Sequence, residues 1–150
     1  MSSTTSLVRQ SWFLTGPTAG GKSALGLLLS EKLPAQIVSM DSMAIYRGMD
    51  IGTAKPSAAE RAQVPHHLID IVNPDCDFSL ADYLDPAQAI VRQLRQQRQT
   101  PLFVGGTPLY LKALLRGMFS GPAADWELRR RYEALAAQDG SAALHRQLER

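Results

Sequence analysis

The sequence has almost no cysteine and no long apolar run. Cys76 is the only cysteine, which excludes a disulfide framework and a zinc site built on several cysteines, and fits a reducing compartment. No stretch approaches the roughly 18 apolar residues of a membrane-spanning helix. Residues 1–11 are polar and lack the apolar core of a secretory signal. We therefore expect a cytoplasmic protein without a membrane span, in which residues 1–11 form a disordered tail.

Neither sign of charge dominates the composition. Lys and Arg number 16 against 14 Asp and Glu, and the formal net charge is +2. This balance neither requires nor excludes a nucleic-acid partner, because the distribution of charge decides that question. A chain of 150 residues with 45% hydrophobic residues can bury one substantial core. We expect a single domain over residues 12–150.

Short apolar segments alternate with segments of helical periodicity. The predicted strands span 12–14, 36–40, 68–72 and 102–104, and the predicted helices span 22–33, 79–99, 107–116, 125–138 and 141–150. This alternation predicts an α/β fold, a parallel sheet with helices on both faces. A linker is expected around residues 120–124. The chain closes in helices without returning to the sheet, so we expect the domain to be incomplete at its C-terminus.

One segment matches the phosphate-binding pattern G-x-x-x-x-G-K-[ST] without a mismatch, between a predicted strand and a predicted helix. Glycines let successive N–H groups converge on phosphate oxygens, and the helix N-terminus favours anions. In this pattern Lys22 adds a positive charge and Ser23 offers its hydroxyl to Mg²⁺. The fold is therefore expected to be P-loop NTPase-like. The residues expected to bind a diphosphate or a nucleotide such as ATP are Gly16, Pro17, Thr18, Ala19, Gly20, Gly21, Lys22 and Ser23.

Two further polar residues follow predicted strands. Asp41 follows the second strand, and Thr107 follows Gly105 and Gly106 after the fourth. Ligands of parallel α/β sheets sit at the carboxyl ends of the strands, so these residues should share one crevice with the P-loop. Asp41 is a candidate general base or a ligand for metal-bound water, or else a turn carboxylate. Thr107 is a candidate site residue or simply the N-cap of a helix.

Other patterns are weaker. Asp70 lies inside an apolar run and Val104 is followed by glycines, so neither strand supplies the magnesium aspartate of a motor-type ATPase. His66 and His67 with Asp70 could indicate a metal site, but structural hydrogen bonds at the start of a strand explain them better. The arginines at 92, 95 and 98 fit a solvated helix face. Those at 129, 130 and 131 point three ways around a helix, so one or two at most can face RNA.

Four blocks of sequence together resemble the tRNA dimethylallyltransferases. The blocks are Gly-Pro-Thr-Ala-Gly-Gly-Lys-Ser at 16–23, Asp-Ser-Met-Ala-Ile-Tyr-Arg-Gly-Met-Asp-Ile-Gly-Thr-Ala-Lys-Pro at 41–56, Pro-His-His-Leu-Ile-Asp-Ile at 65–71 and Gly-Gly-Thr-Pro-Leu-Tyr-Leu-Lys-Ala-Leu at 105–114. The block at 41–56 is the most specific, and the resemblance runs from about Phe13 to the end of the chain. Enzymes of this family move a dimethylallyl group from its diphosphate to the exocyclic N6 amine of an adenosine beside the tRNA anticodon.

The resemblance implies roles for individual residues. The P-loop would hold dimethylallyl diphosphate, with Ser23 near the cofactor Mg²⁺. Asp41 would take a proton from the adenine amine, and Thr107 would be the second catalytic residue. The partner would be the anticodon arm of tRNA, and we expect a monomer. The residues that would contact tRNA are Asp41, Ser42, Met43, Ala44, Thr107 and Arg129.

Some positions depart from the family pattern. Ala44 and Pro108 stand where Gln and Gly are frequent, and members of the family have longer chains. Two alternatives therefore stay open. A small-molecule kinase would use ATP as donor and Asp41 to activate a hydroxyl, and a non-catalytic module would bind tRNA or a diphosphate without turnover.

Overall fold

The computed structural model describes residues 8, 10–118, 121 and 124–148. By its internal contacts the chain divides into two compact units, residues 1–118 and residues 119–150. The expected tail at 1–11 and the expected linker at 120–124 fall mostly outside the described residues. Val8 and Ser11 are described, and both are buried. Whether residues 12–150 form one domain stays a prediction.

The first unit is built on a parallel four-stranded sheet with the order β1-β4-β2-β3. Its strands are β1 (Trp12–Leu14), β2 (Ala35–Ser39), β3 (His66–His67) and β4 (Thr100–Val104). In the register, Phe13 of β1 lies beside Phe103 of β4, which in turn lies beside Val38 of β2. The predicted parallel sheet is confirmed, and all four strands end at the same edge.

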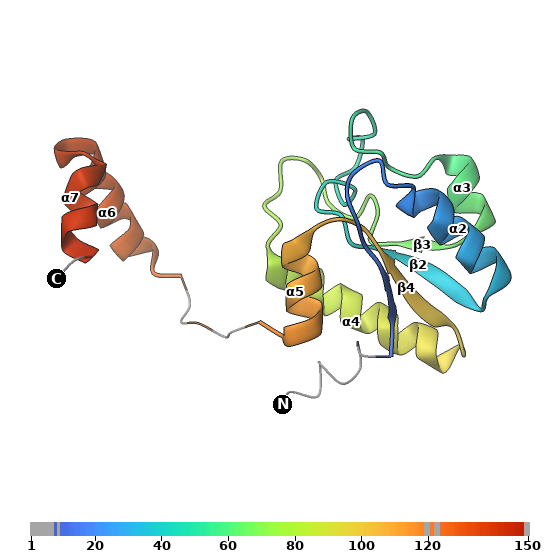
Figure 1. Ribbon diagram of the computed structural model, residues 1–150. Helices are drawn as coiled ribbons and strands as arrows, with labels where there is room; N and C mark the ends of the chain where they lie inside the picture. The colour runs from blue at the N-terminus through green and yellow to red at the C-terminus, as the bar shows by residue number, and fades with distance from the viewer. Residues whose placement is uncertain (1–7, 9, 119–120, 122–123, 149–150) are drawn as a thin grey trace. The chain divides into compact units, whose positions relative to one another are not determined.

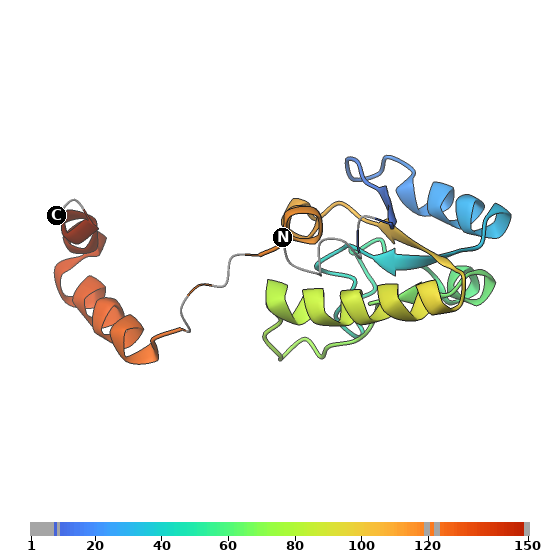
Figure 2. The same cartoon turned by 90° about the horizontal axis from the view of Figure 1, so that it is seen from below.

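Helices cover both faces of this sheet, as Figures 1 and 2 show. One face packs against α4 (Leu80–Gln96) and α5 (Pro108–Arg116), and the other against α2 (Lys22–Lys32). Val64, the residue that ends α3 (Ala58–Gln63), also belongs to this second core. Because side chains alternate along a strand, Phe103 enters the first core and Leu102 the second. The predicted α/β fold with helices on both faces is confirmed.

The third strand was predicted wrongly. The apolar run 68–72 is not a strand, and β3 is formed by the two residues before it. Leu68 and Asp70 adopt left-handed φ angles of 60° and 56°, which an extended strand does not allow. The run instead lies along the segment that follows β2: Ile71 N donates to Ile45 O, and Val72 forms a parallel bridge with Tyr46.

The helices are close to those predicted, with one addition. Ser57 and Glu60 form a reciprocal capping box that starts α3, a helix the periodicity did not indicate. The expected capping box of Ser79 and Asp82 is present at the start of α4. In the second unit, α6 (Trp126–Asp139) and α7 (Ser141–Leu148) contain no buried residue. No helix among the described residues is long and apolar enough to cross a membrane.

Candidate active site

The P-loop leads from β1 into α2. Gly21 has the N-cap position with a φ of 75°, a conformation that favours glycine, and no side chain caps the helix. The first turn of α2 contains no acidic residue, so the unpaired N–H groups of this helix end remain available to an anion. The Lys22 ammonium donates to the carbonyl oxygens of Gly16 (3.0 Å) and Pro17 (2.7 Å). Ser23 is exposed on the first turn of α2.

The ends of three strands meet beside this loop. Gly105 N donates to Leu14 O at the end of β1, and Thr107 N donates to Met40 O just after β2. A Cβ on Gly105 would overlap the Met40 carbonyl group, so only glycine allows the two backbones to approach this closely. A Cβ on Gly106 would lie 3.8 Å from Lys22 Nζ. These contacts bring the P-loop, the residues after β2 and the residues after β4 to one edge of the sheet.

Asp41 begins the segment that leaves β2 at this edge. Its Oδ1 atom accepts hydrogen bonds from the backbone N–H groups of Met43 (2.8 Å) and Ala44 (3.3 Å). Asp41 therefore acts as a turn carboxylate through its Oδ1 atom, as one of the sequence alternatives predicted. Among the described residues, the other oxygen has no hydrogen-bond partner, and Asp41 is only half-buried. The turn thus fixes the carboxylate and leaves Oδ2 available to a substrate.

Thr107 has the N-cap position of α5, yet its side chain does not cap the helix. Its Oγ1 atom instead accepts a hydrogen bond from Ser42 N at 3.1 Å, between residues 65 positions apart in the sequence. Pro108, one of the departures from the family pattern, occupies the first turn of α5, where a missing N–H is tolerated. Thr107 therefore joins the start of α5 to the turn closed by Asp41.

Two buried tyrosines lie beneath this turn. The ring centroids of Tyr83 and Tyr110 are 3.9 Å apart, and the Tyr83 hydroxyl donates to Ser39 O at 2.9 Å. Burial raises the pKa of Tyr110, and the nearby Tyr46 and Asp41 raise it further. Burial also raises the pKa of Tyr83. Both phenols are neutral near pH 7.

The weaker sequence patterns have structural explanations. His66 Nδ1 is 2.7 Å from Val64 O, and His67 Nε2 is 2.8 Å from Gln36 Oε1. Burial is the main cause of the lowered pKa of each histidine. No group of three or more His, Cys, Asp or Glu in the described part of the chain could hold a metal ion. Arg92 and Arg95 are exposed on α4, as a solvated helix face predicts, whereas Arg98 is exposed but lies beyond the end of this helix with a φ of 59°.

Arg129 belongs to the second unit, so its position relative to the P-loop is not defined. On α6 its guanidinium lies 5.4 Å from the ring centroid of Trp126 and pairs with Glu133 at 3.0 Å. The side chain is 64% exposed. An exposed arginine of this kind can reach an RNA phosphate, and its role as a tRNA contact stays a prediction.

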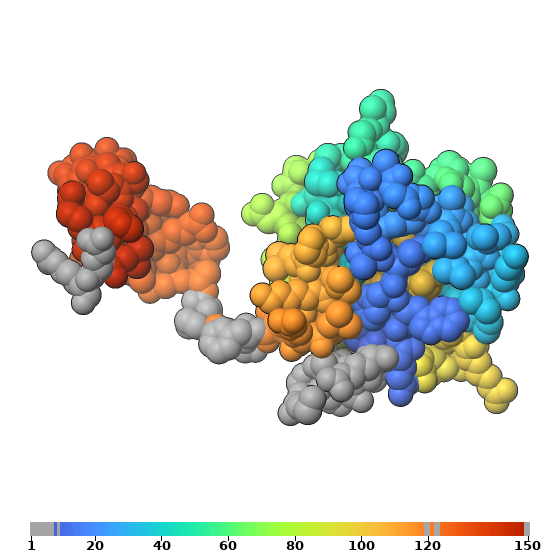
Figure 3. All heavy atoms as spheres, in the orientation of Figure 1, coloured from blue at the N-terminus to red at the C-terminus, as the bar shows by residue number. Residues whose placement is uncertain are grey.

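Sequence reasoning missed a cluster of charged side chains under the segment 41–56. Part of this segment projects from the surface as a narrow teal lobe in Figure 3. Near its end, the Lys55 side chain is only 2% exposed and pairs with Asp50 and Asp70, and Asp70 also pairs with Arg61. These residues come from separate segments of the chain and follow no helix or strand period. The only sequence feature that pointed to them was the family-specific block at 41–56, which contains Asp50 and Lys55.

The arrangement combines a site for a phosphorylated ligand with an adjacent carboxylate. The P-loop and the start of α2 supply N–H groups and one ammonium group for anionic oxygens. Asp41 and Thr107 lie at the neighbouring strand ends, where a second reactant could be placed. Such a site can transfer a group from a phosphate or diphosphate donor to an acceptor that loses a proton.

Comparison with known proteins agrees with this chemistry. The family model described as IPP transferase matches residues 44–150. A tRNA dimethylallyltransferase from Herpetosiphon aurantiacus is 55% identical over 138 residues, which is 91% of this chain and 44% of the relative. One from Ralstonia pickettii is 52% identical, over 90% of this chain and 42% of the relative. The chain thus spans less than half the length of these curated relatives.

Solved structures of similar proteins share the fold. The full-length tRNA isopentenylpyrophosphate transferase from Bacillus halodurans superposes with a TM-score of 0.71 and 41% identity, over 93% of this chain and 46% of that protein. A eukaryotic dimethylallyltransferase, studied while acting on tRNA, gives a TM-score of 0.70 and 25% identity, over 78% of this chain and 30% of that protein.

Proposed function

This chain belongs to the IPP transferase family, whose similar curated members are tRNA dimethylallyltransferases, and from this membership we propose its reaction. The protein transfers a dimethylallyl group from dimethylallyl diphosphate to the N6 amine of an adenosine next to the anticodon of a tRNA. The observation that supports this proposal most directly is the meeting of the P-loop, Asp41 and Thr107 at one edge of the sheet.

The donor binds through its diphosphate. Backbone N–H groups of the P-loop and the start of α2 receive the phosphate oxygens, and the Lys22 ammonium neutralises part of their charge. These groups also stabilise the charge that grows on diphosphate as the bond between its oxygen and the allylic carbon breaks. The binding residues are those from Gly16 to Ser23.

The acceptor is activated by Asp41. The lone pair of an adenine amine is delocalised into the ring, so the nitrogen is a weak nucleophile. As the new bond between N6 and the allylic carbon forms, the amine loses a proton, which Asp41 Oδ2 accepts. A positioned base of this kind contributes about 10²–10⁴-fold in rate. Residues 41–44 and Thr107 line the base, and removing an adenosine from its stack costs a few kcal/mol.

The ion that fits this site is Mg²⁺. Mg²⁺ usually keeps several waters and binds through few protein groups together with substrate phosphates. The exposed Ser23 hydroxyl, beside the phosphate-binding helix end, suits such a ligand set, and no cluster of three carboxylates among the described residues competes for the ion. When bound, the ion neutralises charge on the diphosphate. The protein would act in the cytoplasm as a monomer on the anticodon arm.

The test is transfer of label from dimethylallyl diphosphate to tRNA by the complete protein, with Asp41→Asn as the variant. We expect labelled tRNA from the wild type, and turnover at least about 10²-fold lower in Asp41→Asn with donor binding retained. Asp85→Asn is the matched control, because Asp85 is an exposed aspartate on α4. Near-normal turnover in Asp41→Asn would remove Asp41 from the mechanism. Phosphate transfer from ATP to a small acceptor, without labelled tRNA, would favour the kinase alternative.

A further inference from the structure

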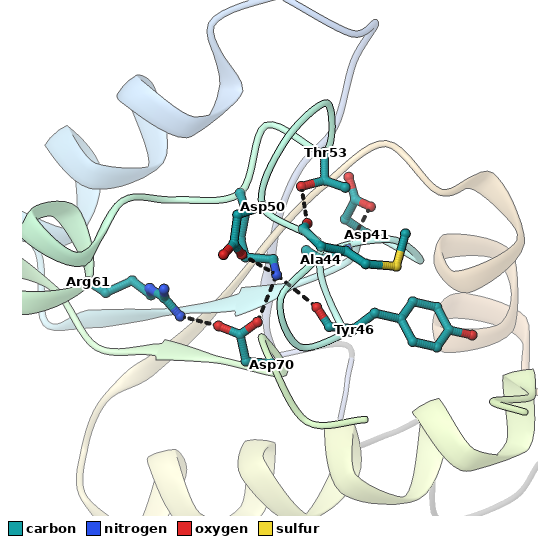
Figure 4. Close-up of polar contacts among 9 residues, drawn as sticks. Asp41, Ala44, Tyr46, Asp50, Thr53, Arg61 and Asp70 are labelled. Atoms are coloured by element: carbon teal, nitrogen blue, oxygen red, sulfur yellow. Dashed lines mark hydrogen bonds and ion pairs between the residues drawn. The ribbon is translucent and has the colours of Figure 1, made fainter. Parts of the chain in front are cut away.

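Lys55, Asp50, Asp70 and Arg61 form a network of ion pairs, which we call the clamp. The Lys55 ammonium donates three hydrogen bonds, to Tyr46 O (2.8 Å), Asp50 Oδ1 (2.7 Å) and Asp70 Oδ1 (2.7 Å). An ammonium group has three donors, so all of them are used. Figure 4 shows these three dashed lines converging on one nitrogen, with Arg61 bound to the far side of the Asp70 carboxylate.

The charges of the cluster compensate one another. Burial lowers the pKa of Lys55, but its hydrogen bonds and ion pairs with Asp50 and Asp70 outweigh burial and raise it overall. The hydrogen bond from Lys55, together with Arg61, lowers the pKa of Asp70. Lys55 and Asp70 are therefore both ionised near neutral pH. Removing only the ammonium group would leave the two carboxylates under-compensated.

The clamp is connected to the turn that carries Asp41. Asp70 binds Lys55 with its side chain, while its backbone N–H donates to Ala44 O at 3.1 Å. The backbone N–H of Ala44 in turn donates to the Asp41 carboxylate. Ala44 is buried, so the link passes through a packed residue and not through solvent. Three contacts thus lead from Lys55 to Asp41.

The backbone on both sides of the clamp has sparsely populated conformations. Ala54, which precedes Lys55, has a φ of 49°, and Asp70 has a φ of 56°. Residues other than glycine keep such angles only where surrounding contacts determine them. The three bonds of Lys55 and the bond from Arg61 to Asp70 are contacts of that kind.

From this geometry we propose that Lys55 is a positioning residue, which holds the turn 41–44 in place for the acceptor base through Asp70 and Ala44. The inference rests on the proposed function. In the described part of the chain, no hydrogen bond or ion pair joins the clamp residues to the P-loop. Lys55 therefore acts on the acceptor side of the reaction and leaves binding of the donor diphosphate unchanged.

The first variant is Lys55→Met, which keeps the length of the side chain and removes the charge. In the complete protein we expect turnover with tRNA to fall by about 10²-fold, because small displacements of catalytic groups have effects of this size. The dissociation constant for dimethylallyl diphosphate stays unchanged. Lys32→Met is the matched control: it removes the same charge from an exposed site in the last turn of α2 and leaves turnover normal.

A second variant separates positioning from simple destabilisation. Lys55→Met alone leaves Asp50 and Asp70 with Arg61 as their one remaining cation. Adding Asp70→Asn restores the balance of charge in the cluster, so the thermal midpoint returns toward that of the wild type. We expect turnover of this double variant to stay about 10²-fold low. Turnover that recovers together with the thermal midpoint would overturn the proposal, and so would a weakened donor site in Lys55→Met. A wild-type protein that labels no tRNA would remove the proposed function, and with it this inference.

Discussion

The hydroxyl group of Thr107 shows how one side chain can join two distant segments. It accepts the N–H of Ser42 and leaves the helix that it precedes without a side-chain cap. Thr107 therefore has the expected N-cap position, but its side chain does not cap the helix. Its oxygen supports the residue next to Asp41, which fits the expectation that Asp41 and Thr107 act at one site.

Replacing Thr107 by valine tests this contact. The shape of the side chain is kept, but the N–H of Ser42 loses its partner, at a cost of about 1–3 kcal/mol where water cannot replace it. We expect turnover with tRNA to fall about tenfold, since each 1.36 kcal/mol is a factor of ten. The measurement is kcat with a saturating donor.

Thr107→Ser is the control for this experiment, because serine keeps the accepting oxygen. Its turnover should stay within about twofold of the wild type. Normal turnover in Thr107→Val would remove the hydroxyl group from this role, and a loss in Thr107→Ser as large as that in Thr107→Val would mean that the hydroxyl group alone does not account for it.

At the scale of helices and strands, the sequence predicted the elements that obey local rules. The strand at 12–14, the P-loop and the capped start of α4 all follow from residue type and spacing. The run 68–72 did not, because its contacts with residues 44–46 and the left-handed Leu68 and Asp70 override β-propensity. Sequence periodicity does not reveal these contacts. They join the two segments that contain Tyr46 and Asp70, both of which accept a hydrogen bond from Lys55.

The buried face of α2 does not follow the spacing of its leucines. By helical period Leu25, Leu28, Leu29 and Leu33 share one side of the helix, yet Leu25 and Leu28 are 44% and 46% exposed. Gly26 is the buried residue, and a Cβ at this position would lie 3.1 Å from the Val104 side chain. A glycine used for close packing carries no hydrophobic signal, so the period of the leucines was misleading.

The capping box at the start of α4 predicts a dependence on pH. Hydrogen bonds from Ser79 lower the pKa of Asp82 in the folded protein. The unfolded chain therefore binds the proton more readily, and the stabilisation is present above the ordinary aspartate pKa and is lost as pH falls through the lowered value. We expect Asp82→Asn to lower the thermal midpoint at pH 7 but not at pH 2.

The control for this prediction lies on the same helix. Asp85 is exposed and takes no part in the capping box, so Asp85→Asn should not change the midpoint at either pH. An equal effect of Asp82→Asn at both pH values would mean that the ionised carboxylate does not stabilise the helix start.

At the scale of the whole molecule, burial is distributed unequally. Among the residues that the structure describes, those of the two hydrophobic cores all lie between Val8 and Leu114, and none belongs to the second unit. The helices α6 and α7 have only 14 and 8 residues, and lengths of this order are marginal for helices without tertiary support. The first unit therefore has a hydrophobic core of its own, whereas α6 and α7 pack on one another without a fully buried residue.

This difference predicts the behaviour of two fragments. Residues 1–118 should unfold cooperatively, with a thermal midpoint close to that of the 150-residue chain. A peptide of residues 119–150 should show little helix by circular dichroism in water. A fragment 1–118 that melts without cooperativity would show that residues 119–150 are needed for the fold of the sheet.

The hydrogen bonds of Lys22 affect the energetics of ligand binding. Its ammonium group already has two carbonyl partners in its own loop, so one of its three donors remains for an incoming anion. The two carbonyl groups fix the direction of this remaining donor before the ligand arrives. Selectivity at the loop then depends on how well an oxygen of each competing anion meets a donor whose direction is already set.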